Sequence, residues 1–297
     1  MCAKFYGAWP ALISPMAADG GLNVKVLREL TAYVLDKGIG GLYLCGSTGE
    51  GIYMPVKERK QVTEVVMAET AGQVPVIVHV GCVATRDAVE LARHSRDCGA
   101  DGVASILPPM NKKIEEVMVH YEKIAASVPD TPFYPYLFGG QTDAVSLMAA
   151  LLERVPNVGG AKYTGPSMYE YKQILDLKEN DWTIFAGMDP QVAFAAMFGG
   201  SANIGTTLNY HPGIFREIHK AVTSGDFIRA RDLQIRANRV TQVMHKYGLM
   251  GALRIAMLML GFDVGGPRWP TLPVPDDQVK TVQQALEAVD FIGLAQM

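Results

Sequence analysis

The sequence contains little that would mark a secreted, membrane-spanning or nucleic-acid-binding protein. Its 297 residues include only four cysteines, Cys2, Cys45, Cys82 and Cys98, and no two of them show the CxxC spacing of metal or redox motifs. No apolar run reaches the roughly 18 residues of a membrane span, and the first residues lack the apolar stretch of a signal peptide. A formal net charge of -3 without dense Lys/Arg runs leaves no basic surface for nucleic acid or an anionic membrane. We therefore expect a cytoplasmic protein with free thiols and small-molecule partners.

What the chain has instead is a regular alternation of short apolar runs and longer amphipathic segments, in a sequence that is 49% hydrophobic. This pattern is typical of βα units around a parallel sheet. Strands are predicted at 7–14, 40–45, 74–80, 102–106, 131–136, 158–162, 183–186 and 201–205. Helices are predicted at 24–37, 56–71, 85–98, 114–127, 144–154, 167–178, 190–198 and 212–222. Eight such units predict an α/β fold, a (β/α)8 TIM barrel over residues 1–223.

The strand signal ends after residue 223, and only helical patterns follow. Helices are predicted at 227–246, 250–260 and 275–288, with an irregular connection rich in Pro and Gly at 261–274. We therefore expect a C-terminal helical extension over residues 224–297. Because no long flexible linker separates it from the barrel, the extension should pack on the barrel as part of one compact unit.

Lys162 is the most informative residue, because it ends the largely apolar run 157–162 and so places a primary amine at the end of a predicted buried strand. An ammonium taken out of water tends to lose its proton, and the neutral amine can attack a carbonyl carbon. This predicts Schiff-base chemistry. The structural alternative is a lysine whose head extends to the rim of the barrel.

A second unusual segment is Gly46-Ser47-Thr48-Gly49-Glu50, which follows a short apolar run and precedes a predicted helix. Small hydroxyl residues and exposed amides at such a place suit an anion such as a carboxylate. The alternative is that Ser47 and Thr48 only cap the following helix, with Glu50 supporting its first turn.

Because the active site of a barrel lies at the carboxyl ends of its strands, other strand ends supply further candidates. Tyr134 and Tyr136 are two residues apart and can face the same side of a strand, where a phenol near Lys162 could move protons. Asp189 could bind substrate or cap the next helix. The remaining candidates at strand ends are Thr164, Gly187, Gly205 and Thr206. His79 and His211 lack a spaced partner set, so we interpret them as structural and expect no metal site.

Taken together, several motifs resemble the dihydrodipicolinate synthase and N-acetylneuraminate lyase family of pyruvate-dependent class I aldolases. The resemblance covers essentially the whole chain. The motifs are Gly46-Ser47-Thr48-Gly49-Glu50, His79-Val80-Gly81-Cys82-Val83, Gly99-Ala100-Asp101-Gly102, Lys162-Tyr163-Thr164 and Ile204-Gly205-Thr206-Thr207.

The resemblance implies that Lys162 forms the Schiff base, that Ser47 and Thr48 hold the pyruvyl carboxylate, and that a tyrosine of the fifth strand moves the proton. Counting forward from Pro132 places this tyrosine at Tyr136, whereas counting back from Lys162 places it at Tyr134. We prefer Tyr136, because a strand changes length less readily than the loop that follows it.

The subgroup signals favour the lyase branch, but some positions depart from it. The segment 137–141 lacks the arginine that the lysine-pathway synthases carry after the fifth strand. Gly187-x-Asp189 resembles the lyases, yet Pro190 stands where they carry an acidic residue that binds the polyol tail. Met110 stands where the family has a tyrosine. Loops set the substrate while the strands hold the shared machinery, so the Schiff-base step is better supported than the aldehyde.

We therefore predict a cofactor-independent class I aldolase that reversibly cleaves a 2-keto sugar acid, with N-acetylneuraminate or a close analogue as the leading substrate, to pyruvate and an aldehyde. The alternatives are a 2-keto-3-deoxy sugar acid aldolase or dehydratase of the same family, and a catalytically weak barrel that binds a keto acid. A metal-dependent aldolase is not favoured, because the sequence lacks a clustered set of His and carboxylate ligands. The resemblance also implies a homo-oligomer, commonly a tetramer.

Overall fold

A computed structural model describes residues 5–108, 113–139, 143–179 and 182–297. In these ranges eight parallel strands form one sheet in the order β1-β8-β7-β6-β5-β4-β3-β2. The strands are β1 (Gly7–Pro10), β2 (Leu42–Leu44), β3 (Val76–His79), β4 (Gly102–Ile106), β5 (Phe133–Phe138), β6 (Gly160–Thr164), β7 (Thr183–Ala186) and β8 (Ala202–Gly205). The edge strands meet through a parallel bridge between Ala11 and Tyr43. The sheet therefore closes into the predicted (β/α)8 barrel.

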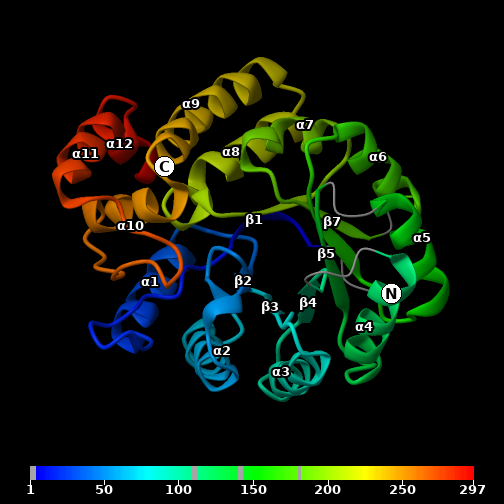
Figure 1. Cartoon of the computed structure of the whole chain (residues 1–297). Helices are drawn as coiled ribbons and strands as arrows, with labels where there is room; N and C mark the ends of the chain where they lie inside the picture. Colours follow the sequence, from blue (N-terminus) through cyan, green and yellow to red (C-terminus); the bar gives the residue numbers. More distant parts are fainter. Residues whose placement is uncertain (1–4, 109–112, 140–142, 180–181) are drawn as a thin grey trace.

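Helices surround the barrel on its outside (Figure 1). Those that alternate with the strands are α1 (Val24–Asp36), α2 (Val56–Thr70), α3 (Thr85–Asp97), α4 (Ile114–Ala126), α5 (Ala144–Arg154), α6 (Met168–Asp176), α7 (Val192–Met197) and α8 (Pro212–Thr223). Short 3-10 helices follow three strand ends, namely η1 (Gly51–Tyr53), η2 (Asp189–Gln191) and η3 (Thr207–Asn209). None of the helices in the described ranges combines the length and the apolar character needed to cross a bilayer.

The C-terminal helices gather at one side of the barrel (Figure 1). They are α9 (Phe227–Lys246), α10 (Leu249–Met259), η4 (Asp276–Gln278), α11 (Val279–Glu287) and α12 (Phe291–Ala295). Helix α9 packs against α8, and α10 packs against α9. The short helix α12 is not among the predicted elements, because five residues are too few to show a helical period. Its buried Phe291 packs on the His211 ring at 4.8 Å between centroids.

Two strands extend further than the sequence pattern predicts. As a result, Lys162 and Tyr136 lie inside their strands and not at the strand ends. Strand β6 continues to Thr164, so Lys162 is inside the strand and not at its end. Strand β5 continues to Phe138, beyond the predicted end at Tyr136. Pairing between the two strands explains the extension, because Leu137 pairs with Tyr163 and Phe138 with Thr164 after the pair Tyr136 and Lys162. Register between neighbouring strands is invisible to periodicity within one strand.

The interior of the barrel is filled by large aromatic side chains. Trp9, Tyr43, Tyr134 and Phe185 are each at most 1% exposed and belong to one buried cluster. The Trp9 and Phe185 rings meet edge to face with centroids 5.1 Å apart. The indole ring of Trp9 fits only because Gly41 has no side chain, since a Cβ there would lie 2.5 Å from it. The barrel is therefore packed below the level of the predicted site.

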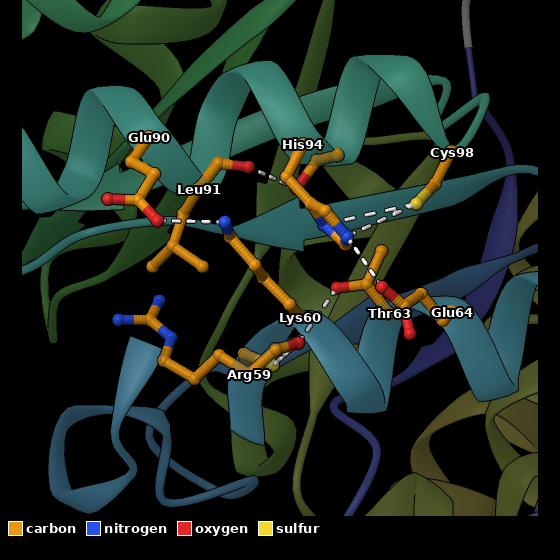
Figure 2. A network of polar contacts seen from close by, with 10 residues as sticks. Arg59, Lys60, Thr63, Glu64, Glu90, Leu91, His94 and Cys98 are labelled. Carbon is orange, nitrogen blue, oxygen red and sulfur yellow. Dashed lines mark hydrogen bonds and ion pairs between the residues drawn. The ribbon is translucent and has the colours of Figure 1, made fainter. Parts of the chain in front are cut away.

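Polar contacts also join neighbouring helices on the outside of the barrel. Figure 2 shows α2 and α3 linked by Lys60 with Glu90 and by Glu64 with His94, at 2.7 and 2.8 Å. Pairs with exposed partners such as these contribute little free energy, about 0–1 kcal/mol each. The apolar faces of the helices, and not these pairs, hold the outer layer to the sheet.

A buried ion pair joins the turn after β2 to the C-terminal helices. Glu50 is 2% exposed and its carboxylate pairs with the guanidinium of Arg254 on α10, while the Arg268 N–H donates to Glu50 Oε1 at 2.9 Å. Arg268 in turn pairs with Glu58 at the start of α2. Burial raises the pKa of the Glu50 carboxyl, and the charge of Arg254 opposes this shift. The predicted carboxylate-binding turn is thus tied to α10 and to the connection that follows it, 204 and 218 residues further along the chain.

We expect the substitution Glu50→Gln to lower the free energy of unfolding by about 3–5 kcal/mol, because it leaves the Arg254 guanidinium buried without its counter-charge. Urea denaturation followed by circular dichroism measures this change. The double variant Glu50→Gln with Arg254→Met removes both charges and should regain part of the loss. A single variant as stable as the parent would show that the ion pair does not hold the turn.

Candidate active site

A cavity of about 390 Å³ lies at the carboxyl ends of the strands. The predicted site residues that line it are Ser47, Thr48, Tyr136, Lys162, Thr164, Gly187, Asp189, Gly205 and Thr206. Tyr134 is the one predicted residue missing from the lining. The cavity brings together residues of β5, β6 and β8 and residues that follow β2 and β7, as expected when the ends of parallel strands meet at one face of a barrel.

Lys162 lies deep in this cavity, between two aromatic rings. Its Nζ is 4.2 Å from the centre of the Tyr136 ring and 4.9 Å from that of Tyr43, and the residue is only 5% exposed. The position of Tyr136 follows from its pairing with Lys162 across β5 and β6. Ring faces stabilise a positive charge through their quadrupole. The pair of rings therefore suits a cationic nitrogen at this place.

Tyr134 lies lower in the barrel than Tyr136. It is 1% exposed, and its ring packs against Phe185 and Phe5 with centroids 5.8 and 6.1 Å away. Both tyrosines belong to the same face of β5, as their spacing predicts. They differ in depth, because two residues along a strand correspond to roughly 6.5 Å. That distance places only Tyr136 at the level of the amine.

The segment from Gly46 to Glu50 forms a tight turn and does not cap helix α2. That helix begins at Val56 with Pro55 at its N-cap, so the predicted capping alternative is wrong for Ser47 and Thr48. Gly46 is required because a Cβ there would lie 2.6 Å from the Tyr43 ring. The Thr48 hydroxyl lies 2.7 Å from that of Thr206 at the end of β8, and Ser47 is exposed to the cavity.

Asp189 turns inward and does not cap a helix. Its Oδ2 accepts hydrogen bonds from the backbone N–H and the hydroxyl of Thr207, at 2.9 and 2.7 Å, and Oδ1 has no partner among the described residues. Burial raises the pKa of the carboxyl, while the Thr207 bonds and the charge of Lys162 oppose that shift. Gly205 permits this packing, since a Cβ there would lie 1.6 Å from Oδ1.

His79 is a structural residue below the cavity. The Ile106 N–H donates to Nε2 at 3.0 Å, so Nδ1 carries the proton and faces the Cys45 carbonyl at 3.1 Å. Burial, aided by the charge of Arg59, holds the pKa of His79 well below its usual range. The neutral ring therefore ties β3 to the turn after β2 and to β4. His211 also has a backbone partner, because its Nε2 lies 2.8 Å from the Phe291 carbonyl.

Several lining residues were not among the predicted site residues, although Ile204 and Thr207 belong to a quoted motif and Phe138 to the segment 137–141. These lining residues are Phe138, Met188, Pro190, Ile204, Thr207, Thr241, His245, Leu249 and Met250. Pro190 was noted only as a departure from the lyases. The residues of α9 and α10 carry no motif. The only sequence feature that could have indicated them is that predicted helices follow the barrel and could cover its open end. Met110 and Gln141 lie outside the described residues, so the differences noted there stay predictions.

Within the described ranges, no group of three His, Cys, Asp or Glu side chains is placed to hold a metal ion. The described thiols of Cys45, Cys82 and Cys98 are free. The cavity brings the amine of Lys162, the phenol of Tyr136 and the hydroxyls of Ser47 and Thr48 to one space.

Comparison with known proteins finds one family along nearly the whole chain. Residues 4–289 match the model described as the dihydrodipicolinate synthetase family. The N-acetylneuraminate lyase of Mediterraneibacter gnavus is 30% identical over 96% of this chain and 93% of its own, and that of Danio rerio is 29% identical over 95% and 96%. The structure of Proteus mirabilis N-acetylneuraminate lyase superposes with a TM-score of 0.93 at 29% identity, covering 97% of this chain and all of the other.

We expect Thr207→Val to lower the free energy of unfolding at pH 7 by about 1.5–3 kcal/mol, because it removes a donor from the buried Asp189 carboxylate. The carboxyl has a raised pKa in the folded state and is charged only above it. The deficit should therefore be largest at pH values above this raised pKa, where the carboxyl is charged, and should shrink as the pH falls through it. Urea denaturation at several pH values measures both effects. In the matched control Thr63→Val, which loses only a bond to Arg59 O in its own helix, no such pH dependence is expected.

Proposed function

The chain belongs to the dihydrodipicolinate synthetase family, and on this premise we propose that it is a class I aldolase that reversibly cleaves a 2-keto sugar acid to pyruvate and an aldehyde. N-acetylneuraminate or a close analogue is the leading substrate, because the relatives described above are N-acetylneuraminate lyases. The observation that carries the proposal is the buried Lys162 amine between the rings of Tyr136 and Tyr43.

The first step is attack of the Lys162 amine on the C2 keto carbon of the substrate. The resulting carbinolamine loses water, and an iminium ion links Nζ to C2. We assign the protons of this step to Tyr136, and the support for this assignment is that its ring lies against Nζ. The positive charge that develops on Nζ faces both aromatic rings, which lowers its energy in a site shielded from water.

The substrate carboxylate next to C2 is held by the turn after β2. The hydroxyls of Ser47 and Thr48 line the cavity, and Thr206 holds the Thr48 hydroxyl in place at 2.7 Å. Hydroxyl donors fixed by the protein orient the keto carbon towards Nζ without the cost of ordering them during the reaction.

Cleavage breaks the bond between C3 and C4. When the carbinolamine loses water, the Tyr136 phenol protonates the leaving hydroxyl and becomes a phenolate. The C4 hydroxyl gives its proton to this phenolate, the aldehyde leaves, and the electron pair of the broken bond moves to C3 and into the iminium to form an enamine. Protonation at C3 and hydrolysis of the imine release pyruvate and restore Lys162. Because the imine itself accepts the electrons, the proposal requires no metal or organic cofactor.

We further propose a homo-oligomer, in line with the family resemblance. The described surface carries exposed apolar side chains that a second copy could cover. Among them are Phe194 on α7, Phe198 at its end, and Phe227 and Ile228 at the start of α9. A reducing cytoplasm is the proposed compartment, since the thiols of Cys45, Cys82 and Cys98 are free.

Incubation with pyruvate and sodium borohydride should attach one reduced pyruvyl group to the native chain, because borohydride traps the imine. Intact mass measures the adduct, and peptide mapping should place it on Lys162. The variant Lys162→Ala should remain unlabelled. If the native chain also stays unlabelled under conditions that label a known class I aldolase, the Schiff-base mechanism is wrong.

Tyr136→Phe is expected to form the imine more slowly, so that prolonged trapping still labels Lys162, and to lower kcat by about 10²–10⁴-fold, because the ring remains while the proton carrier is lost. The matched variant Tyr134→Phe should change kcat far less, since Tyr134 lies below the cavity. Initial rates of pyruvate release from N-acetylneuraminate compare the two. The opposite ranking would assign the proton transfer to Tyr134.

A further inference from the structure

One face of helix α9 carries a row of four polar residues. Gln234, Asn238, Thr241 and His245 are spaced by four, three and four positions, which is the spacing of neighbours on one helical face. The first two make hydrogen bonds to the turn after β7, and the last two line the active-site cavity. The same face of α9 therefore braces that turn and forms a side of the cavity.

The brace fixes the position of α9 relative to the cavity. The Gln234 side-chain amide donates to the Asp189 carbonyl at 3.0 Å, and that of Asn238 donates to the Pro190 carbonyl at 3.1 Å. Gln234 also donates to Asn238 Oδ1 at 2.8 Å, so the two amides hold each other in place. His245 lies seven residues beyond Asn238, which corresponds to roughly 10 Å along the helix axis. The helix thus carries His245 beyond its contact with Pro190.

His245 lies at the open end of the cavity, and its imidazole is free to bind a ligand. It lines the same cavity as Lys162, but His245 is exposed, whereas Lys162 is only 5% exposed. Its ring makes no hydrogen bond or ion pair with any other residue that the structure describes. A histidine ring has two nitrogens, each of which can donate or accept according to its protonation. The ring can therefore exchange its bonds with water for bonds to a hydroxyl group.

The turn after β7 does not offer a comparable group through Met188 or Pro190. Pro190 has no N–H, and its carbonyl is occupied by the amide from α9. The Met188 carbonyl accepts from the Gln191 N–H at 2.9 Å. The Thr164 hydroxyl and Asp189 Oδ1 line the cavity and lack partners among the described residues, but both atoms are buried. The exposed His245 ring therefore serves a different part of a bound molecule than these deeper atoms do.

We propose that His245 is a specificity-determining residue, which binds a hydroxyl group at the end of the substrate furthest from C2. The inference rests on the proposed function, because it requires C2 to be bound at Lys162. With the carboxylate beside Ser47 and Thr48, the rest of the substrate extends towards the open end of the cavity. The substrate class is accordingly a 2-keto sugar acid that carries hydroxyl groups at its far end.

Replacing His245 by an apolar ring of similar size tests this assignment. His245→Phe should lower kcat/KM for N-acetylneuraminate by about three- to tenfold, mainly through KM, because one hydrogen bond to the bound substrate is lost. The rate at which pyruvate and borohydride label Lys162 should not change, since pyruvate is too short to extend to the open end. His245→Gln keeps a donor and an acceptor, and should restore part of the loss.

The matched control is His94→Phe on α3. It removes a surface pair with Glu64 and lies outside the cavity lining, so kcat/KM for N-acetylneuraminate should stay unchanged. Initial rates of pyruvate release compare the three variants with the native chain. The assignment is wrong if His245→Phe loses nothing, if His94→Phe loses as much, or if His245→Gln restores nothing.

Pyruvate trapping separates this inference from the proposed function. A native chain that is labelled on Lys162 but does not cleave N-acetylneuraminate, or cleaves it equally well without the His245 ring, rejects the assignment and leaves the Schiff-base step intact. A native chain that stays unlabelled rejects both.

Discussion

The buried pair of Glu50 and Arg254 is the interaction on which the arrangement of the cavity depends. It joins the turn that carries Ser47 and Thr48 to the helix whose first residues, Leu249 and Met250, line the same cavity. A carboxylate that is 2% exposed needs its partner, because the charge would otherwise lie in a medium of low polarity. The turn and the helix are therefore positioned together, and the two sides of the cavity keep a fixed relation.

The cavity divides its tasks between strands and later elements. The strands supply Lys162 and Tyr136, whose relation is set by the register of two neighbouring strands. The turn after β7 and the helices α9 and α10 supply further lining residues, and Gln234 and Asn238 of α9 donate hydrogen bonds to the backbone carbonyls of that turn. A reaction shared across a family can then stay constant on the strands, while the aldehyde side varies with the loops and helices.

Most of the fold followed from the pattern of apolar runs, and the errors have identifiable causes. The strand through Lys162 extends further than predicted, because its pairing with β5 supports Tyr163 and Thr164. Capping of the next helix was an alternative for Asp189 because Pro190 follows it, but its carboxylate bonds to Thr207, which belongs to the next strand end. Capping was also an alternative for Ser47 and Thr48, but the helix begins at Val56. In each case a contact with a distant segment prevailed over the local signal.

The sequence by itself determined that a lysine would lie in a buried strand of a (β/α)8 barrel and that a small hydroxyl-rich turn would lie at the same face, because both depend on local composition and on the order of elements. Only the tertiary structure decided that Tyr136 and not Tyr134 lies beside Lys162, that Tyr43 covers the other side of the amine, and that Leu249 and Met250 line the cavity. These facts depend on strand register, on depth within the closed barrel and on the docking of the last helices, which are contacts between residues far apart in the chain.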